Sequence, residues 1–294
     1  MSEWLHHPSY ARQRDALIEL FRENVYTFPK LRPVVFLCGA VGSQSRDRIA
    51  QYLRERTKSL VFYADEVWAR LASEDLNALQ MEDHFAELSD IVIIVVESPG
   101  TYCELGAFSL SPSLRRKLLP LIDTSYRNVP SFINTGPVRW INKESEFAPA
   151  LYGDHKIILS LMPEIEKRMV FLRFRGTQQV SNIAQSPKHL LFLICDLVAI
   201  IGPASIDDIR YYLEKIVNDL PVGDVAEILG VAVSLKLVSE HSPYFYCDLN
   251  EGEIHEFRRK KALSPAHERA KFLGVFQTIP RANVVLNQIT APIC

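Results

Sequence analysis

The sequence has few cysteines, and their spacing matches neither a metal site nor a disulfide framework. Its five cysteines, Cys38, Cys103, Cys195, Cys247 and Cys294, lie far apart in the 294-residue chain. No pair has the CxxC spacing of a zinc site, and an odd number cannot be paired completely. We therefore expect no bound metal and a reducing compartment.

The chain also lacks a long hydrophobic run and an excess of one charge. Charged residues occur at the N-terminus, where a secretion signal would need its apolar stretch, and no segment reaches the ~18 consecutive apolar residues of a membrane span. Lys and Arg number 33 against 35 Asp and Glu, so the net charge is -2 and no global basic field attracts nucleic acid. We expect a cytoplasmic protein with no membrane partner.

The composition is that of a folded protein of about two domains. Hydrophobic residues make up 48% of the chain and charged residues 23%, which excludes large-scale disorder. Domains usually have about 100 to 200 residues, so 294 residues are enough for two.

The first half of the chain alternates short apolar runs with helical patterns. An amphipathic pattern predicts a helix between Tyr10 and Phe28, and the run that begins at Pro33 predicts a first strand before Gly39 and Gly42. Further strands are predicted at Leu60–Tyr63, Ile91–Val96 and Lys117–Ile122. The six consecutive β-branched residues from Ile91 predict the central strand, covered on both faces. This order predicts an α/β fold, a Rossmann-like parallel sheet flanked by helices, with ligands at the carboxyl ends of its strands.

After about residue 150 the pattern changes. Helical periodicity over Ile157–Phe174 leads to a polar segment, and three helices follow at His189–Ile201, Ser205–Val217 and Val222–Leu235. A hairpin over 237–249 completes the order of a winged helix. We therefore predict an α/β domain over residues 1–155, a helical connector over 156–187, a winged-helix domain over 188–250 and a C-terminal helical tail over 251–294.

The segment ESPGTYCELGAFS, residues 97–109, holds the main candidate for catalysis. We expect a helix over Tyr102–Ser109 with Glu104 in its first turn, where unpaired backbone N–H groups and the helix dipole favour an ionised carboxylate. Such a group can attack the anomeric carbon of a nucleoside or stabilise an oxocarbenium ion. The alternative is structural, because Thr101 and Glu104 have the spacing of a capping box.

Several segments of the first half resemble the nucleoside 2-deoxyribosyltransferase-like effectors encoded beside bacterial retrons. They are FLCGAVG (36–42), FYADEVW (62–68), SDIVIIVVESPGTYCELGAFS (89–109), LRRKL (114–118) and SFINTGPVR (131–139), and the likeness spans about half the chain. Such an effector has a nucleoside deoxyribosyltransferase-like catalytic domain, a helical part and a winged-helix domain. The resemblance implies an N-glycosidase toxin of antiphage defence with Glu104 as its catalytic residue. It also implies NAD or a related nucleotide as the substrate, and control by a complex of reverse transcriptase with msDNA and msrRNA.

Other acidic residues are candidates for substrate binding. Asp65 and Glu66 follow a predicted strand, as base- or sugar-binding carboxylates do, although a helix N-cap and a first-turn acid explain them equally well. Glu82 could donate a proton or bind ribose hydroxyls, and the alternative is an ordinary solvated helix face. Gly39, Asp65 and Glu104 all lie at or just beyond the carboxyl ends of predicted strands.

Glycines and one arginine are candidates for contact with the sugar and its phosphate. Gly39 lies at the first turn, and Ser98 and Gly100 lie in the turn after the central strand, where a small residue lets a ligand approach the backbone. Arg139 could bind phosphate bidentately. The glycines do not form a complete GxGxxG fingerprint, so we expect no bound redox NAD and no other cofactor.

The second half offers weak signals for nucleic-acid binding. The predicted third helix over 222–235 is acidic and apolar, which favours protein docking over phosphate contact. A basic run at 258–261, followed by Arg269 and Lys271, could contact a nucleic-acid backbone, but such runs are usually just solvated.

Two other functions stay open from the sequence. One is transfer of deoxyribose between bases, and the other is a regulator that senses a nucleotide without turnover and binds DNA. We also expect a higher-order or homo-oligomeric assembly.

Overall fold

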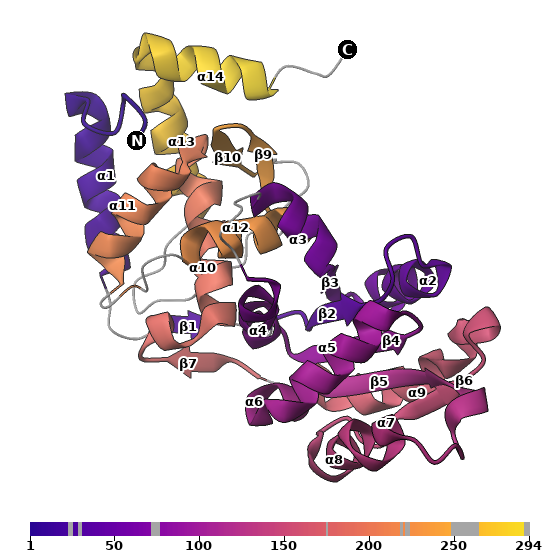
Figure 1. Cartoon of the computed structure of the whole chain (residues 1–294). Coiled ribbons are helices and arrows are strands. Elements are labelled where there is room, and N and C mark those ends of the chain that lie inside the picture. Colours follow the sequence, from indigo (N-terminus) through magenta and orange to yellow (C-terminus); the bar gives the residue numbers. More distant parts are fainter. Residues whose placement is uncertain are drawn as a thin grey trace. The chain divides into compact units, whose positions relative to one another are not determined.

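The computed structural model describes residues 1–22, 26–28, 31–71, 77–174, 176–217, 220, 224–247 and 265–290. The chain divides into two compact units (Figure 1). The α/β unit comprises Arg32–Arg175, and the helical unit combines Met1–Leu31 with Gly176–Cys294. This division differs from the predicted boundaries, because the N-terminal segment belongs with the C-terminal half, and residues 158–172 contribute side chains to the core of the sheet unit.

A five-stranded parallel sheet forms the centre of the α/β unit. Its strands are β2 (Val34–Cys38), β3 (Leu60–Phe62), β4 (Ile91–Val96), β5 (Leu118–Asp123) and β6 (Leu151–Gly153), in the order β3-β2-β4-β5-β6. The predicted parallel sheet is thus confirmed, with β4 at its centre. The edge strand β6 was not predicted.

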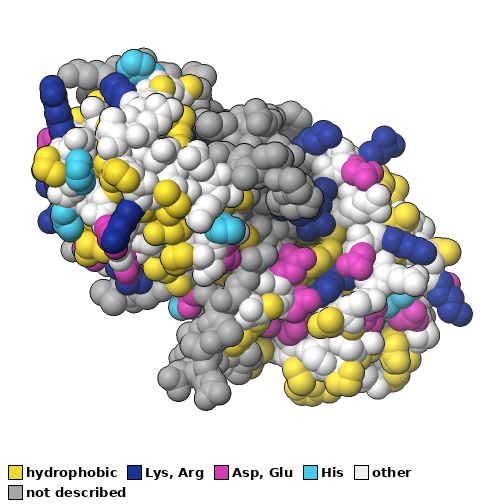
Figure 2. Space-filling view, turned by 90° about the horizontal axis from the view of Figure 1, so that it is seen from above, with side chains coloured by type: hydrophobic (Ala, Val, Ile, Leu, Met, Phe, Trp, Pro, Cys, Tyr) yellow, Lys and Arg dark blue, Asp and Glu magenta, His cyan; other side chains and the backbone are white. Residues whose placement is uncertain are grey.

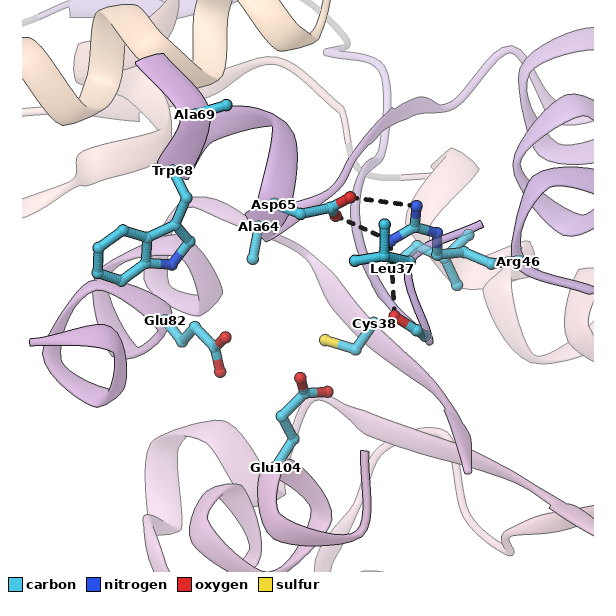
Figure 3. A pocket seen from close by; sticks show the side chains of 11 residues that line it. Leu37, Cys38, Arg46, Ala64, Asp65, Trp68, Ala69, Glu82 and Glu104 are labelled. Carbon is cyan, nitrogen blue, oxygen red and sulfur yellow. Dashed lines mark hydrogen bonds and ion pairs between the residues drawn. The ribbon is translucent and has the colours of Figure 1, made fainter. Parts of the chain in front are cut away.

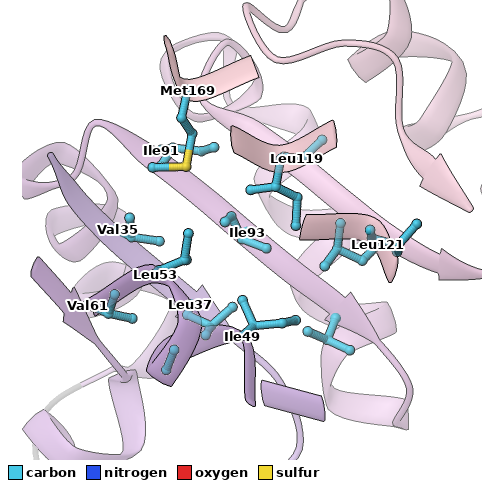
Figure 4. Close-up of a cluster of buried hydrophobic side chains, with 14 of the residues drawn as sticks. Val35, Leu37, Ile49, Leu53, Val61, Ile91, Ile93, Leu119, Leu121 and Met169 are labelled. Carbon is cyan, nitrogen blue, oxygen red and sulfur yellow. The ribbon is translucent and has the colours of Figure 1, made fainter. Parts of the chain in front are cut away.

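Helices cover both faces of this sheet. They are α2 (Gln44–Tyr52), α3 (Ala64–Leu71), α4 (Ala78–Leu88), α5 (Pro99–Leu110), α6 (Pro112–Arg115), α7 (Phe132–Thr135), α8 (Pro137–Glu144) and α9 (Met162–Met169). On one face, Val35 and Ile93 pack with Ile49 of α2 and Met169 of α9 (Figure 4). On the other face, Phe36 packs against side chains of α4 and α5. Successive side chains of β2 therefore point to opposite faces of the sheet and pack against different helix layers, as expected for a pleated strand.

The strand order creates a crevice beside β2. From β2 the chain passes to the edge strand β3 and then returns to the other side of β2 as β4. Connections that leave neighbouring strands in opposite directions open a crevice at their carboxyl ends. At this point the backbone N–H of Ala40 donates to Oε1 of Glu97 at 3.2 Å, which ties the end of β2 to the end of β4.

The helix expected over Ile157–Phe174 is broken into three parts. A 3₁₀ helix over His155–Leu161 precedes α9, and a second 3₁₀ helix covers Val170–Phe174. Ile157 has φ -119° and ψ 40°, outside the helical region. Pro163 then lies in the first turn of α9, where its missing N–H costs no helical hydrogen bond.

The helical unit begins with α1 (Pro8–Phe21), which ends before the predicted position. Residues Tyr26–Phe28 form β1 instead and pair with β7 (Gln178–Val180). Tyr10 of α1 packs against Phe272 and Phe276 of α13 (Pro265–Thr278), and α14 (Pro280–Thr290) follows. These contacts place the N-terminal helix in this unit.

The predicted three helices and hairpin are present in the helical unit, and one strand is added. The elements are α10 (Pro187–Ile201), β8 (Ala204–Ser205), α11 (Ile206–Ile216), α12 (Asp224–Ser234), β9 (Ser239–His241) and β10 (Tyr244–Tyr246). The strands form an antiparallel sheet in the order β8-β10-β9. Ser205 caps α11 in a capping box with Asp208.

Basic residues do not gather into one patch on the face shown in Figure 2, where the described Lys and Arg side chains lie singly or in small groups. The run 258–261 lies outside the described residues. Arg269 is buried and donates to the carbonyl oxygens of Ile200 and Gly202. The expectation that Arg269 contacts a nucleic-acid backbone is therefore wrong. Lys271 pairs with Glu268 at 2.9 Å.

No helix in the described part of the chain is long and apolar enough to cross a membrane.

Candidate active site

A pocket of about 480 Å³ lies at the carboxyl ends of β2 and β3 (Figure 3). This volume lies within the usual range of small-molecule sites. The pocket lies at the end of β2, where the strand order reverses. Its lining residues are Leu37, Cys38, Gly39, Val41, Arg46, Ala64, Asp65, Trp68, Ala69, Glu82 and Glu104.

Glu104 lies in the second turn of α5, not in the first turn as predicted. The helix begins at Pro99, and Ser98 is its N-cap. The capping box joins Ser98 and Thr101: Ser98 Oγ accepts from the backbone N–H of Thr101, and Thr101 Oγ1 accepts from the backbone N–H of Ser98. The capping role considered for Glu104 is therefore wrong, and its carboxyl group faces the pocket.

Burial governs the charge of Glu104. Its surroundings raise the pKa of the carboxyl group above the ordinary 4.5, mainly through loss of solvent, with a further increase from Asp65. A hydrogen bond from the Cys38 thiol and the positive charge of Arg46 lower the pKa and oppose this effect. The expectation that the helix end favours the ionised form is thus corrected. Oε2 has no hydrogen-bond partner in the described part of the chain.

Glu82 of α4 lies across the pocket from Glu104 (Figure 3). Burial, and to a lesser extent the charge of Glu104, raise the pKa of Glu82 to about 7. Two carboxyl groups in one pocket titrate as a pair. Near neutral pH, Glu82 holds a proton for part of the time, helped by the negative charge of Glu104, so Glu104 is the ionised member of the pair, an asymmetry that glycosidases use.

Asp65 is held at the pocket wall by Arg46. Nη1 of Arg46 donates to Oδ1 of Asp65 at 2.8 Å, and Nη2 donates to Oδ2 at 3.2 Å. Asp65 is also a first-turn acid of α3, the alternative position considered from the sequence. The Trp68 indole lies one helical turn further along the same wall and offers an aromatic surface to a ligand.

The structure brings together four of the eight predicted site residues: Gly39, Asp65, Glu82 and Glu104. The other four are outside the pocket lining. Glu66 is exposed on α3, Ser98 caps α5, Gly100 is exposed in the first turn of α5, and Arg139 is exposed on α8. Their binding roles stay predictions.

Arg46, Cys38 and Trp68 were missed as site residues. Arg46 is in a polar helical segment, where a solvated position is the ordinary expectation. Trp68 could have been found, because it follows Asp65 by three residues and therefore shares its helix face. In the described ranges no group of His, Cys, Asp and Glu side chains is arranged to hold a metal ion.

Comparisons with known proteins place the chain beside retron proteins. The family model of the STM3845 retron effector protein matches residues 42–240. The Escherichia coli "Retron Ec86 putative ribosyltransferase/DNA-binding protein" is 34% identical over 137 residues, which is 45% of this chain and 45% of that protein. The corresponding protein of retron Ec73, also from Escherichia coli, is 33% identical over 126 residues, or 40% of each chain. Each match thus spans less than half the length of the relative.

Proposed function

Because this chain belongs to the STM3845 retron effector protein family, we propose that it is an effector enzyme that breaks the N-glycosidic bond of a nucleotide. The observation that carries the proposal is the pair of carboxyl groups, Glu104 and Glu82, that face each other across one pocket at the sheet edge. The names of the two relatives, which describe ribosyltransferases, agree with chemistry at a ribose. NAD is the candidate substrate that the sequence resemblance supports.

In the proposed reaction, the sugar of the nucleotide lies between the two carboxyl groups. Glu104 attacks C1' or stabilises the oxocarbenium ion, while the C1'–N bond breaks and its electron pair moves to the base. A neutral base takes a proton from Glu82 as it leaves, whereas the nicotinamide of NAD already carries a positive charge and needs none. Water then attacks C1' in place of an acceptor base, its proton passes to the carboxylate form of Glu82, and the bond or contact between Glu104 and C1' is released, so the overall reaction is hydrolysis.

We propose that the helical unit serves control rather than chemistry. Its order of helices and strands fits a winged helix, and both relatives are named as DNA-binding. However, α12, the third helix of this order, has the sequence DVAEILGVAVS without Lys or Arg, and several of its apolar side chains are buried. The lack of basic residues makes phosphate contact by α12 unfavourable, and we propose that the unit docks on protein instead. The proposed partner is the reverse transcriptase with its msDNA and msrRNA, in a higher-order or homo-oligomeric assembly.

Base release by the purified full chain tests the activity. We expect free base from NAD or another nucleotide, and Glu104→Gln should reduce the rate by more than about a thousandfold, since it removes the attacking group. Glu87→Gln, an exposed acid on α4, is the matched control and should keep the activity. Adding a free acceptor base distinguishes transfer from hydrolysis. The proposal fails if the wild type releases no base from any nucleotide, or if the Glu104→Gln variant is equally active.

Expression in bacterial cells tests the proposed control. The chain alone should deplete the substrate nucleotide and slow growth, and coexpression of the reverse transcriptase and its msDNA should suppress both effects. Sequence-specific duplex binding in a gel-shift assay, without nucleotide turnover, would instead favour the DNA-binding regulator.

A further inference from the structure

Arg46 is a buried cation that joins the ends of the two strands beside the pocket. Its side chain is 7% exposed, and both of its terminal nitrogens contact Asp65. Nη1 also donates to the carbonyl oxygen of Gly39 at 3.5 Å. The guanidinium lies over the Tyr63 ring, 4.1 Å from its centroid. Gly39 follows β2, and the other two residues follow β3, so one side chain connects both strand ends.

The surrounding residues are shaped to hold this guanidinium. A Cβ atom at Gly39 would lie 3.0 Å from Cδ of Arg46 and 3.1 Å from its Cβ, so the glycine makes room for the arginine stem. Burial of a guanidinium is costly unless hydrogen bonds and opposite charge compensate it. The bidentate contact with Asp65 and the Tyr63 ring compensate the two terminal nitrogens, and Nε lies 3.9 Å from Oδ1 of Asp47. A buried charge held this closely keeps a fixed position at the pocket.

Arg46 also acts on Glu104 through its charge. The groups that face Glu104 come from four other elements: Cys38 of β2, Arg46 of α2, Asp65 of α3 and Glu82 of α4. Among the described residues that line the pocket, Arg46 is the one cation. Its charge lowers the pKa of Glu104, whereas the charge of Asp65 raises that pKa. The two members of the ion pair therefore influence Glu104 in opposite directions.

We propose that Arg46 is a positioning residue for the reaction, because its guanidinium holds the Asp65 carboxylate toward the substrate and keeps Glu104 in the ionised form that attacks the sugar. This inference rests on the proposed function. It assigns Arg46 two separable effects. The charge sets the pH at which Glu104 becomes active, and the two parallel hydrogen bonds set the place of Asp65.

The test compares pH profiles of kcat for Arg46→Gln, Arg46→Lys and Asp65→Asn in the full chain. Arg46→Gln removes the cation, so the pH at which activity is lost on the acid side of the profile (the acid limb) should shift to higher pH by about 1 unit. Asp65→Asn removes the nearby anion and should shift the acid limb to lower pH. A merely structural role would predict that breaking the pair from either side has the same effect. Arg48→Gln, an exposed cation on the same helix, is the control and should leave the limb in place.

Arg46→Lys separates the charge from the geometry. A lysine keeps the positive charge but cannot form the bidentate contact. We expect the acid limb close to its wild-type position and a KM that is higher by about tenfold, because Asp65 is no longer held. This variant and Asp65→Asn also keep the test decisive if Arg46→Gln does not fold.

Direct titration of the Glu104 carboxyl group gives a readout that does not need turnover. In protein labelled with ¹³C at glutamate side chains, the Glu104 signal is assigned by its loss in Glu104→Gln, and its pKa should rise in Arg46→Gln and fall in Asp65→Asn. Equal directions, or no change in either variant, would overturn the role of Arg46. An inactive wild type with the expected opposite shifts would overturn the proposed function but leave the electrostatic role of Arg46 standing.

Discussion

Replacing Glu82 with glutamine should stabilise the protein above neutral pH and at the same time reduce its activity. Burial and the charge of Glu104 raise the pKa of Glu82 from 4.5 to about 7. The folded state therefore binds the proton more tightly than the unfolded state does. The resulting penalty on folding is absent below the unfolded pKa, grows as the pH rises from 4.5, and is complete above about 7. Glutamine has no charge to bury and avoids the penalty.

The size of the effect follows from the shift. Each pKa unit corresponds to about 1.4 kcal/mol, so the shift sets an upper bound of about 3 kcal/mol. Glu82 lines an open pocket and its titration is coupled to the charge of Glu104, so solvent screening and coupling reduce this bound. We expect Glu82→Gln to raise the free energy of unfolding by about 1–2 kcal/mol at pH 8 and by much less at pH 5.

Urea denaturation at pH 5 and pH 8 measures this difference. Glu87→Gln, on the exposed side of the same helix, should show no such pH dependence. The reasoning is refuted if the Glu82→Gln variant is less stable than the wild type at pH 8, or if the stability difference does not change with pH. In the base-release assay the same substitution should slow cleavage of nucleotides with a neutral base by about a hundredfold. Stabilisation combined with lost activity is the pattern of a group kept for function rather than for folding.

Two further predictions concern α5 and the cysteines. Ser98→Ala should lower the free energy of unfolding by about 1 kcal/mol through loss of the N-cap, whereas Glu104→Gln leaves the Ser98–Thr101 capping box intact; equal losses in urea denaturation would contradict the assigned cap. At pH 7.5 iodoacetamide should label the exposed Cys103 but not the buried Cys38, because burial raises the pKa of the Cys38 thiol. Peptide mass spectrometry checks this, and labelling of both at the same rate would show that Cys38 is accessible.

The strands that could be predicted are those with continuous apolar runs. Ile91–Val96 is buried along its whole length, so its sequence contains the signal of a central strand. β6 has three residues, Leu151–Gly153, and its place depends on pairing with β5. β1 is equally short and pairs with β7, far along the chain. Local periodicity cannot detect such pairing, which explains why the first helix was predicted to continue to Phe28.

The site residues that directly follow a strand could be predicted from the sequence. Gly39 and Asp65 come together because each follows a parallel strand, and parallel strands end at the same edge. Glu82 joins them from α4, the helix before β4, as considered from the sequence. Arg46 could not be found in this way. It is the third residue of α2, and its burial depends on a glycine and a carboxylate from two other elements.

The protonation state of Glu104 cannot be predicted from its position in the sequence alone. From the motif, a helix end predicted an ionised carboxylate, but α5 begins at Pro99 and its first turn contains no acid. The charge of Glu104 instead depends on burial, which favours the neutral form, and on Arg46 and Cys38, which favour the ionised form. Because those groups come from β2 and α2, the pH at which this carboxylate becomes a nucleophile is a property of the folded pocket. The opposite shifts expected for Arg46→Gln and Asp65→Asn are therefore the measurement that links this fold to the proposed chemistry.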